Sequence, residues 1–303
     1  MQIPAHCELC PRRCGADRTR TRGRCQGGSQ VTVARAALHH WEEPCISGSR
    51  GSGTVFFSGC SLQCCYCQNW HISSQGFGRP VSIRQLADIF LDLQRQGAHN
   101  INLVTPGHWA PWVVEALDQA RDRGLTLSIV CNTSSYETVE TVELLARHVT
   151  VWLADIKYIS SRLSGEYSAA PDYFEVAEKA IGRMLQLAGS PVFGPDGILQ
   201  RGVILRHLAL PGALADSKAV LEWMAALPAG SFIPSLMSQY TPFYKAAEHK
   251  ALGRRISSWE YRQVVNTAVD LGLCQGYMQE KSSAKEEYTP AFDLTGVPES
   301  YCE

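Results

Sequence analysis

Four cysteines lie close together in one short stretch of the sequence, SGCSLQCCYCQNW at residues 58–70. They follow an apolar run, TVFFSG, and two triplets have a spacing suited to metal binding: Cys60, Cys64 and Cys67, or Cys60, Cys65 and Cys67. A structural zinc site normally takes two separated Cys-x2-Cys pairs, and no second pair follows downstream. Three thiolates from one loop instead suit a 4Fe–4S cluster in which one iron lacks a protein ligand. Such an open position can bind a substrate or a cofactor.

A second group of cysteines precedes this loop, at Cys7, Cys10, Cys14 and Cys25. The group supplies four soft ligands in a segment with too few apolar residues to fold unaided. We therefore expect a metal here. Zinc in a closed tetrahedral site is the first interpretation, and an auxiliary iron–sulfur cluster is the alternative.

The composition favours a folded cytoplasmic protein. Of its 303 residues, 45% are hydrophobic and 19% are charged, which is ordinary for a globular chain. The formal net charge of −1 gives no reason to expect a nucleic acid or an anionic membrane as partner. No long apolar run or signal-peptide pattern is present, so we expect the twelve cysteines to be reduced. Their role is then metal binding or catalysis rather than disulfide formation.

Six alternating strand and helix patterns must position the cysteines. Short apolar runs predict the strands, and each is followed by a segment whose apolar residues have helical spacing. The strands are expected at 54–59, 101–106, 125–134, 149–158, 202–212 and 231–240, and the helices at 82–97, 111–124, 136–148, 171–189, 216–228 and 258–272. Regular alternation with short connections predicts parallel strands joined by right-handed crossovers. We therefore predict an α/β fold, a partial (β/α)6 TIM-like barrel with the cysteine loop after its first strand.

The chain is expected to divide into three parts. Residues 1–50 form a small Cys-rich N-terminal metal-binding module, residues 51–278 form the barrel, and residues 279–303 form a polar C-terminal tail. The tail is either disordered or laid over the barrel.

An ordered set of motifs at the expected strand ends resembles the radical S-adenosylmethionine (radical SAM) superfamily. Within it, the chain resembles the branch related to pyruvate formate-lyase activating enzymes, and more closely the uncharacterised iron–sulfur proteins that open with CxLCPRxCG. The likeness runs from Cys7 to about residue 275. It is carried by the motifs CELCPRRCG, GSGTVFFSGCSLQCCYCQNW, HNINLVTPGH, NTSSY, ADIKY, RLSG, APDY, ILRHLALPG and MSQY.

The resemblance implies a cofactor and a chemistry. It assigns Cys60, Cys64 and Cys67 to a 4Fe–4S cluster whose fourth iron chelates the methionine part of S-adenosyl-L-methionine (SAM). An electron from the reduced cluster would cleave SAM to a 5′-deoxyadenosyl radical, which abstracts hydrogen from a substrate. The electron would come from a flavodoxin- or ferredoxin-type reductant. Cys65 is left as a small packed residue.

The resemblance also implies positions for SAM binding. Tyr66 and Asn69 lie in the cysteine loop itself, and Asp155 and Lys157 match the DxK motif of the activating enzymes. The remaining candidates end other strands: Thr105, Gly107, Asn132, Arg206 and His207. Many relatives have a GGE segment at the end of the second strand, whereas this chain has TPG there and no acidic residue.

The superfamily does not fix the net reaction, and three outcomes are considered. They are activation of a glycyl radical enzyme, radical oxidation of a peptide or small molecule, and redox-neutral epimerisation. Cys131 stands where Tyr is expected before the Asn of the NTS segment. It is either a small residue packed against a helix or, because it lies at a strand end, a thiol hydrogen donor. Cys274 and Cys302 are further candidate thiols. We therefore predict epimerisation of a small hydroxyl-rich, sugar-like metabolite, with the activating-enzyme and oxidation reactions as alternatives.

Overall fold

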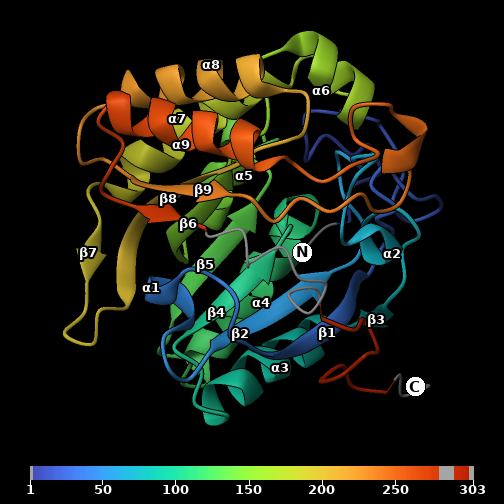
Figure 1. The fold of residues 1–303 in the computed structure, drawn as a ribbon. Coiled ribbons are helices and arrows are strands. Elements are labelled where there is room, and N and C mark those ends of the chain that lie inside the picture. Colours follow the sequence, from blue (N-terminus) through green and yellow to red (C-terminus); the bar gives the residue numbers. More distant parts are fainter. Residues whose placement is uncertain (1–2, 280–289, 300–303) are drawn as a thin grey trace.

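One long sheet organises the chain, which a computed structural model describes for residues 3–279 and 290–299 (Figure 1). The order of its hydrogen-bonded strands is β10-β9-β8-β6-β5-β4-β2-β1-β3, with β7 beside β8. Six strands from β2 to β9 are joined in parallel, as predicted. They are β2 (Ser52–Phe57), β4 (Asn100–Val104), β5 (Ser128–Thr133), β6 (Val149–Asp155), β8 (Leu199–Leu208) and β9 (Ile233–Met237).

A helix follows each of these six strands along the chain and covers the outer face of the sheet. The helices are α3 (Ile83–Arg95), α4 (Ala110–Asp122), α5 (Val139–Leu145), α7 (Tyr173–Ala188), α8 (Leu214–Ala225) and α9 (Ser258–Asp270). The mixed α/β architecture with a mostly parallel sheet confirms the predicted fold class.

The sequence of α3 shows why these helices form and where they pack. Ser82 caps its first turn in a capping box with Gln85, which satisfies backbone N–H groups that lack a helical partner. Its apolar residues recur with helical spacing and are buried, as at Leu86, Phe90 and Leu93. This stripe joins the main core between the sheet and the helices.

Several elements lie outside the six predicted pairs. Strand β1 (Val31–His39) runs antiparallel to β2 and also pairs with β3 (Arg79–Val81). The others are β7 (Val192–Phe193), β10 (Tyr277–Met278), the short helices α1 (Pro44–Ser47), α2 (Trp70–Ser73) and α6 (Ser161–Ser168), and the 3-10 turns η1 (Gly107–Trp109) and η2 (Ala246–Glu248). The boundary expected at residue 50 therefore falls between two paired strands, and the division into parts stays a prediction.

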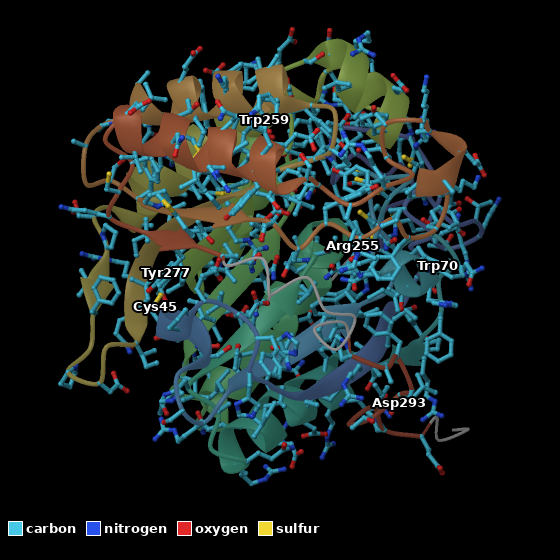
Figure 2. The ribbon with its side chains drawn as sticks, viewed as in Figure 1. Cys45, Trp70, Arg255, Trp259, Tyr277 and Asp293 are labelled. Atoms are coloured by element: carbon cyan, nitrogen blue, oxygen red, sulfur yellow. The ribbon has the colours of Figure 1, made fainter. Side chains whose placement is uncertain are left out.

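The concave face of the sheet carries a smaller apolar cluster. Cys45 and Ile46 of α1 pack there against Val130, Val151 and Ile204 of the parallel strands. Figure 2 shows Cys45 beside Tyr277 of β10, which packs against the same cluster. Helix α1 therefore packs inside the partial barrel, below the carboxyl ends of the barrel strands.

Residues 290–299 lie along β1. Leu294 donates a backbone hydrogen bond to Ala34, and Ala36 donates one to Thr295. The part of the tail at 280–289 and 300–303, with Cys302, lies outside the described residues. None of the described helices is long and apolar enough to cross a membrane.

Candidate active site

The loop after β2 and the ends of the parallel strands enclose one cavity of about 220 Å³. Cys60, Cys64 and Cys67 line it from the loop side. The other lining residues include Tyr66, Asn69, Thr105, Asn132, Asp155, Lys157, Arg206 and Gln239. Cys65 does not line the cavity, and its backbone N–H donates to the Tyr167 carbonyl at 2.8 Å. The arrangement supports the triplet of Cys60, Cys64 and Cys67.

A glycine turns the chain into this loop. Gly59 has φ +90°, and a Cβ there would collide with the carbonyl oxygen of Cys25. The preceding carbonyl, of Ser58, accepts from the Trp109 indole at 3.1 Å and lies 3.0 Å from Nε2 of His108. The loop therefore starts from a fixed point between the N-terminal segment and η1.

The three thiols are held in a desolvated place. Burial, with Cys64 beside it, raises the pKa of Cys60 to about 12. Burial also raises the pKa of Cys67, against a hydrogen bond from Ser73 at 3.3 Å. Ser168 donates a hydrogen bond to the Cys64 sulfur at 2.9 Å. Because only thiolates bind metal, a metal centre must supply the positive charge that deprotonates these groups.

The donor set fits a cluster better than a single ion. Among residues 3–279 and 290–299, no three His, Cys, Asp or Glu side chains converge closely enough to hold one metal ion. The thiolates of a cuboidal cluster each bind a different iron, so they need not converge on one point. Three cysteine sulfurs on one cavity wall, two of them accepting hydroxyl hydrogen bonds, are suitable ligands for such a cluster.

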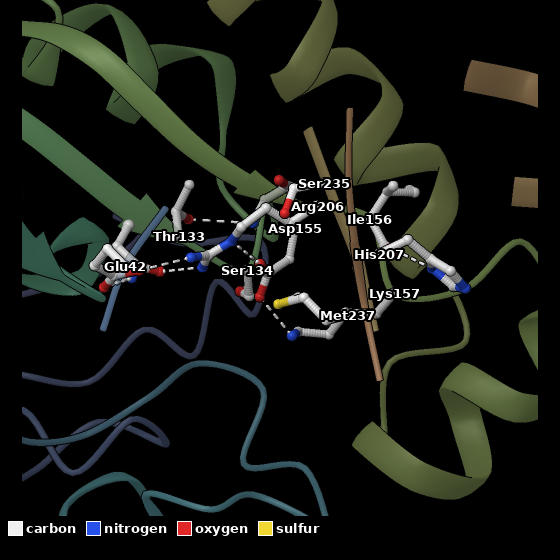
Figure 3. A network of polar contacts seen from close by, with 12 residues as sticks. Glu42, Thr133, Ser134, Asp155, Ile156, Lys157, Arg206, His207, Ser235 and Met237 are labelled. Atoms are coloured by element: carbon white, nitrogen blue, oxygen red, sulfur yellow. Dashed lines mark hydrogen bonds and ion pairs between the residues drawn. The ribbon is translucent and has the colours of Figure 1, made fainter. Parts of the chain in front are cut away.

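Arg206 is the centre of a polar network on the opposite wall (Figure 3). Its guanidinium donates to Asp155 at 2.9 Å, to Asn132 at 2.6 Å and to Glu42 at 3.1 Å. Lys157 donates to the second oxygen of Asp155 at 2.7 Å. Burial opposes ionisation of Asp155, but Lys157 and Arg206 together lower the pKa of its carboxyl. The network therefore keeps two cations and the carboxylate of Asp155 charged beside the cavity.

Two glutamates that the sequence analysis missed complete this network. Glu42 accepts hydrogen bonds from Asn102 at 3.1 Å and from Asn132 at 3.0 Å, and it lines the cavity. Burial raises the pKa of Glu43, which accepts from Ser235 at 2.9 Å. Both lie between β1 and α1, in a segment expected to belong to a separate module. The sequence did offer a signal for them, because the two adjacent acids come directly before Pro44, and proline is common in the first turn of a helix.

Of three further predicted positions, Thr105 and Asn69 line the cavity and Gly107 does not. Thr105 lines the cavity with φ +57°, and its N–H donates to the Asn132 carbonyl at 2.8 Å. The side-chain oxygen of Asn69 is buried and has no hydrogen-bond partner in the described chain. Gly107 does not line the cavity, because it packs against Glu137, whose carboxylate fills the place of a Cβ.

Like Gly107, Cys131 and His207 do not line the cavity, which corrects the place expected for His207 and agrees with the packed alternative for Cys131. Cys131 is 1% exposed and packs in the core between sheet and helices. His207 lies 2.8 Å from the Ile156 carbonyl and 2.9 Å from the Ser217 hydroxyl, and Figure 3 shows it pointing away from the Arg206 guanidinium. Strand side chains alternate between faces, so each is turned outward while its neighbour, Asn132 or Arg206, faces the cavity. Cys274 is exposed and does not line the cavity either.

The N-terminal cysteines form no disulfide within the described chain. Cys7, Cys10 and Cys25 are buried and Cys14 is exposed. Beside them, Arg18 is 1% exposed, with its guanidinium 4.3 Å from the ring centre of Trp109 and 4.5 Å from that of Trp112. Burial raises the pKa of Cys25, and Arg18 opposes that shift. Arg18 therefore partly offsets the cost of a thiolate at Cys25, whereas burial raises the pKa of Cys10 to about 12.

A family comparison matches the central part of the chain. Residues 54–192 match the description of the radical SAM superfamily. An uncharacterised protein of Methanocaldococcus jannaschii is 27% identical over 275 residues, which are 88% of this chain and 75% of that protein. Because that relative is itself uncharacterised, the likeness assigns no activity to this chain.

Solved structures are similar to the chain at low sequence identity. Methylornithine synthase is 12% identical with a TM-score of 0.50, over 72% of this chain and 60% of its own. A domain of a pyruvate-formate lyase-activating enzyme from Bacteroides vulgatus is 18% identical with a TM-score of 0.42, over 57% of this chain and 92% of its own. The first likeness shows the shared fold alone.

Proposed function

The chain belongs to the radical SAM superfamily of SAM-cleaving enzymes. From this premise we propose that its cavity is where a radical derived from SAM abstracts hydrogen from a small polar substrate. Membership implies a 4Fe–4S cluster and SAM as cofactors. When bound, that cluster supplies the electron that splits SAM and yields the 5′-deoxyadenosyl radical. One observation carries the proposal: a single cavity is lined by Cys60, Cys64 and Cys67 on one side and by charged strand-end residues on the other.

The cysteine loop would hold the cluster through Cys60, Cys64 and Cys67. Ser168 and Ser73 donate hydrogen bonds to the sulfurs of Cys64 and Cys67. Such bonds stabilise thiolate charge and tune a cluster's reduction potential.

The polar wall would bind SAM's methionine and ribose groups. Lys157 provides an ammonium group suited to a carboxylate, and the unpartnered oxygen of Asn69 can accept a hydrogen bond from an N–H. Asp155, Asn132 and Thr105 add acceptors and donors on the same wall. His207 and Gly107 would act indirectly, because neither lines the cavity.

The lining of the cavity favours a small, hydroxyl-rich substrate over a protein loop. Trp41 and His39 line it from the N-terminal side. Glu42 and Gln239 offer hydrogen-bonding groups suited to hydroxyls. These features favour a metabolite over the activating-enzyme reaction.

Redox-neutral epimerisation is the finer version of this proposal, and it needs a second hydrogen donor beside the substrate. Cys131 packs among the helices, so we do not assign it that role. Analysis of the product must therefore decide whether the reaction is an epimerisation. Inverted product with no net redox change supports it, and an oxidised product supports the alternative.

The deciding experiment is SAM cleavage by anaerobically reconstituted protein with dithionite as reductant. We expect 5′-deoxyadenosine to form, and to form faster with the correct hydroxylated metabolite. The Cys60→Ala variant is the matched control and should be inactive. A correctly folded protein with an intact cluster that cleaves no SAM would overturn the proposal.

For the N-terminal cysteines we propose a structural metal site, with zinc as its ion. In the described residues no three of these ligands converge on one point, so zinc would have to draw the thiols together as it binds. The support is four reduced thiols, three of them buried, beside the buried Arg18 guanidinium. Metal analysis should find one zinc per chain in addition to the iron. Iron in excess of one cluster, lost in the Cys10→Ser variant, would indicate the auxiliary cluster instead. A protein that contains neither zinc nor this extra iron would refute the site.

A further inference from the structure

We propose that the exposed arginines of residues 13–24 form a docking surface for an acidic one-electron carrier protein. This arginine segment comprises Arg13, Arg20, Arg22 and Arg24, all exposed. The inference rests on the proposed function, because SAM cleavage needs an electron from outside the chain. It adds the place where that electron's carrier binds and the charge of the carrier's surface.

The arginine segment concentrates positive charge in a chain that is nearly neutral. Residues 12–24 contain six arginines and a single acid, Asp17, whereas the whole chain has a formal net charge of −1. Arg20 has only a loose ion pair with Asp17, at 3.6 Å with 84% of the arginine side chain exposed. In the described part of the chain, no carboxylate pairs with Arg13, Arg22 or Arg24. Exposed charges without internal partners remain free to attract an oppositely charged surface.

The backbone of this segment packs directly on the cysteine loop. Gln63 of the loop donates to the Arg24 carbonyl at 2.8 Å. Gly59, at the start of the loop, lies against the Cys25 carbonyl so closely that a Cβ would collide with it. Figure 1 shows the N-terminal segment, in dark blue, beside α2, which follows the loop. A protein bound to the arginine segment therefore lies over the loop that would hold the cluster.

The two other arginines of the region fix the segment in place. Arg12 donates to the carbonyls of Ser61, at 2.9 Å, and Ser168, at 2.9 Å, and so ties the segment to the cysteine loop and to α6. Arg18 is buried between Trp109 and Trp112 and donates to the His108 carbonyl at 2.6 Å. The exposed arginines are thus presented by an anchored backbone, which reduces the entropy lost on docking.

Electrostatic complementarity acts mainly on the rate of association. Basic surface charges attract an acidic carrier over a distance that shortens with ionic strength. Removing exposed rim charges should therefore slow the encounter and weaken its salt dependence, and should leave the chemistry of the site intact.

The test compares two charge-reversed proteins. The first carries Arg20→Glu, Arg22→Glu and Arg24→Glu. The matched control carries Arg84→Glu, Lys179→Glu and Arg262→Glu, three exposed residues on α3, α7 and α9. SAM cleavage is measured at low salt with a reduced ferredoxin as electron donor, and separately with dithionite.

We expect the first variant to lose at least about tenfold in the ferredoxin-driven rate, with the dithionite-driven rate unchanged. The control variant should keep both rates, and wild-type protein should slow as salt is added. An equal loss with dithionite, or an unchanged ferredoxin rate, would overturn the docking surface.

A binding measurement separates this proposal from the proposed function. Oxidised ferredoxin should bind wild-type and control protein with a salt-dependent affinity and bind the first variant at least about tenfold more weakly. Wild-type protein that binds ferredoxin but fails to cleave SAM with dithionite would refute the function and leave the docking surface standing. Equal affinity for all three proteins would refute the docking surface.

Discussion

The two faces of β5 and β8 carry adjacent residues with opposite roles. Asn132 and Arg206 face the cavity and share a hydrogen bond of 2.6 Å. Their chain neighbours Cys131 and His207 are buried on the side of the helices, where the ring nitrogens of His207 lie at hydrogen-bond distance from the Ile156 carbonyl and the Ser217 hydroxyl. Burial lowers the pKa of His207 to about 4, so it is neutral at physiological pH.

The contrast teaches that a position at a strand end does not by itself make a site residue. Alternation of side chains along a strand decides which of two neighbours reaches the cavity. Arg206 is tolerated on the cavity side because it pairs with Asp155 and Glu42, whereas His207 on the helix side is kept neutral by burial. The same contrast separates Cys64, which lines the cavity, from Cys65, which does not.

The largest expected effect comes from that pair of cysteines. Cys64→Ala should reduce SAM cleavage by at least about a hundredfold, because loss of a ligand exceeds the loss from an outer-shell partner. Cys65→Ala should retain most of the activity. Iron content, the cluster's absorbance and 5′-deoxyadenosine yield measure both variants. Equal loss in the two would break the distinction.

The second test compares Arg206→Met with His207→Gln. Removal of Arg206 leaves Asp155 and Glu42 without their shared cation and should cost about 3–5 kcal/mol of unfolding free energy. His207→Gln can keep one of two hydrogen bonds and should cost about 1–2 kcal/mol. Denaturant unfolding measures both. A larger loss in His207→Gln would contradict the charge argument.

The third test uses the pH dependence of stability, in which Asp155 and Glu137 have opposite signs. The pKa of Asp155 is lowered in the folded protein, so its contribution is present above the ordinary pKa and lost as the pH falls through the lowered value. Burial raises the pKa of Glu137 from 4.5 to about 7. The folded state then holds a proton that the unfolded state releases, and stability falls as the pH rises through this window.

Glu137→Gln should remove that decline and raise stability above pH 7 by up to about 3 kcal/mol relative to wild type. The amide can still accept the hydrogen bond from Thr133 that the carboxylate accepts at 3.0 Å. Thermal unfolding between pH 4 and pH 8 measures the effect. A wild-type profile that is flat through pH 4.5–7 would show that Glu137 has an ordinary pKa.

The smallest effect is expected for Cys131→Ala. Its thiol packs among buried apolar side chains, so the change should cost about 1 kcal/mol of stability and leave product formation unaltered. The product is analysed for inversion once the substrate is known. If 5′-deoxyadenosine forms but the inverted product disappears, Cys131 is the hydrogen donor. Its side chain would then have to turn toward the cavity during the reaction.

Much of the fold was predictable because the parallel strands and their helices have strong local patterns. TVFFSG, INLVTP and VTVWLADIKY are apolar runs that became β2, β4 and β6, and the capped stripe of α3 followed from its spacing. The cysteine loop was recognisable from its spacing, whereas Asp155, Lys157 and Arg206 were expected near it because their motifs resemble those of the radical SAM superfamily.

The remainder depended on contacts between distant segments. The apolar pattern of β1 is interrupted by Arg35, whose side chain pairs at 2.7 Å with Asp293, a partner far along the chain. Glu42 and Glu43 reach the network only because α1 enters the concave face of the sheet. Which of two adjacent strand-end residues faces inward depended on a register that the sequence pattern did not resolve.

The hydrogen bonds of residues 294 and 295 with β1 have a consequence for self-association. β1 lies next to the end of the sheet, where β3 covers only Val31–Val33. Further along, Ala34 and Ala36 bond to Leu294 and Thr295 instead of presenting free backbone groups. An uncovered strand edge is a template for pairing with another molecule. Residues 294 and 295 thus cover the backbone groups at this edge of β1. A chain shortened before residue 290 would expose them as a site for edge-to-edge aggregation.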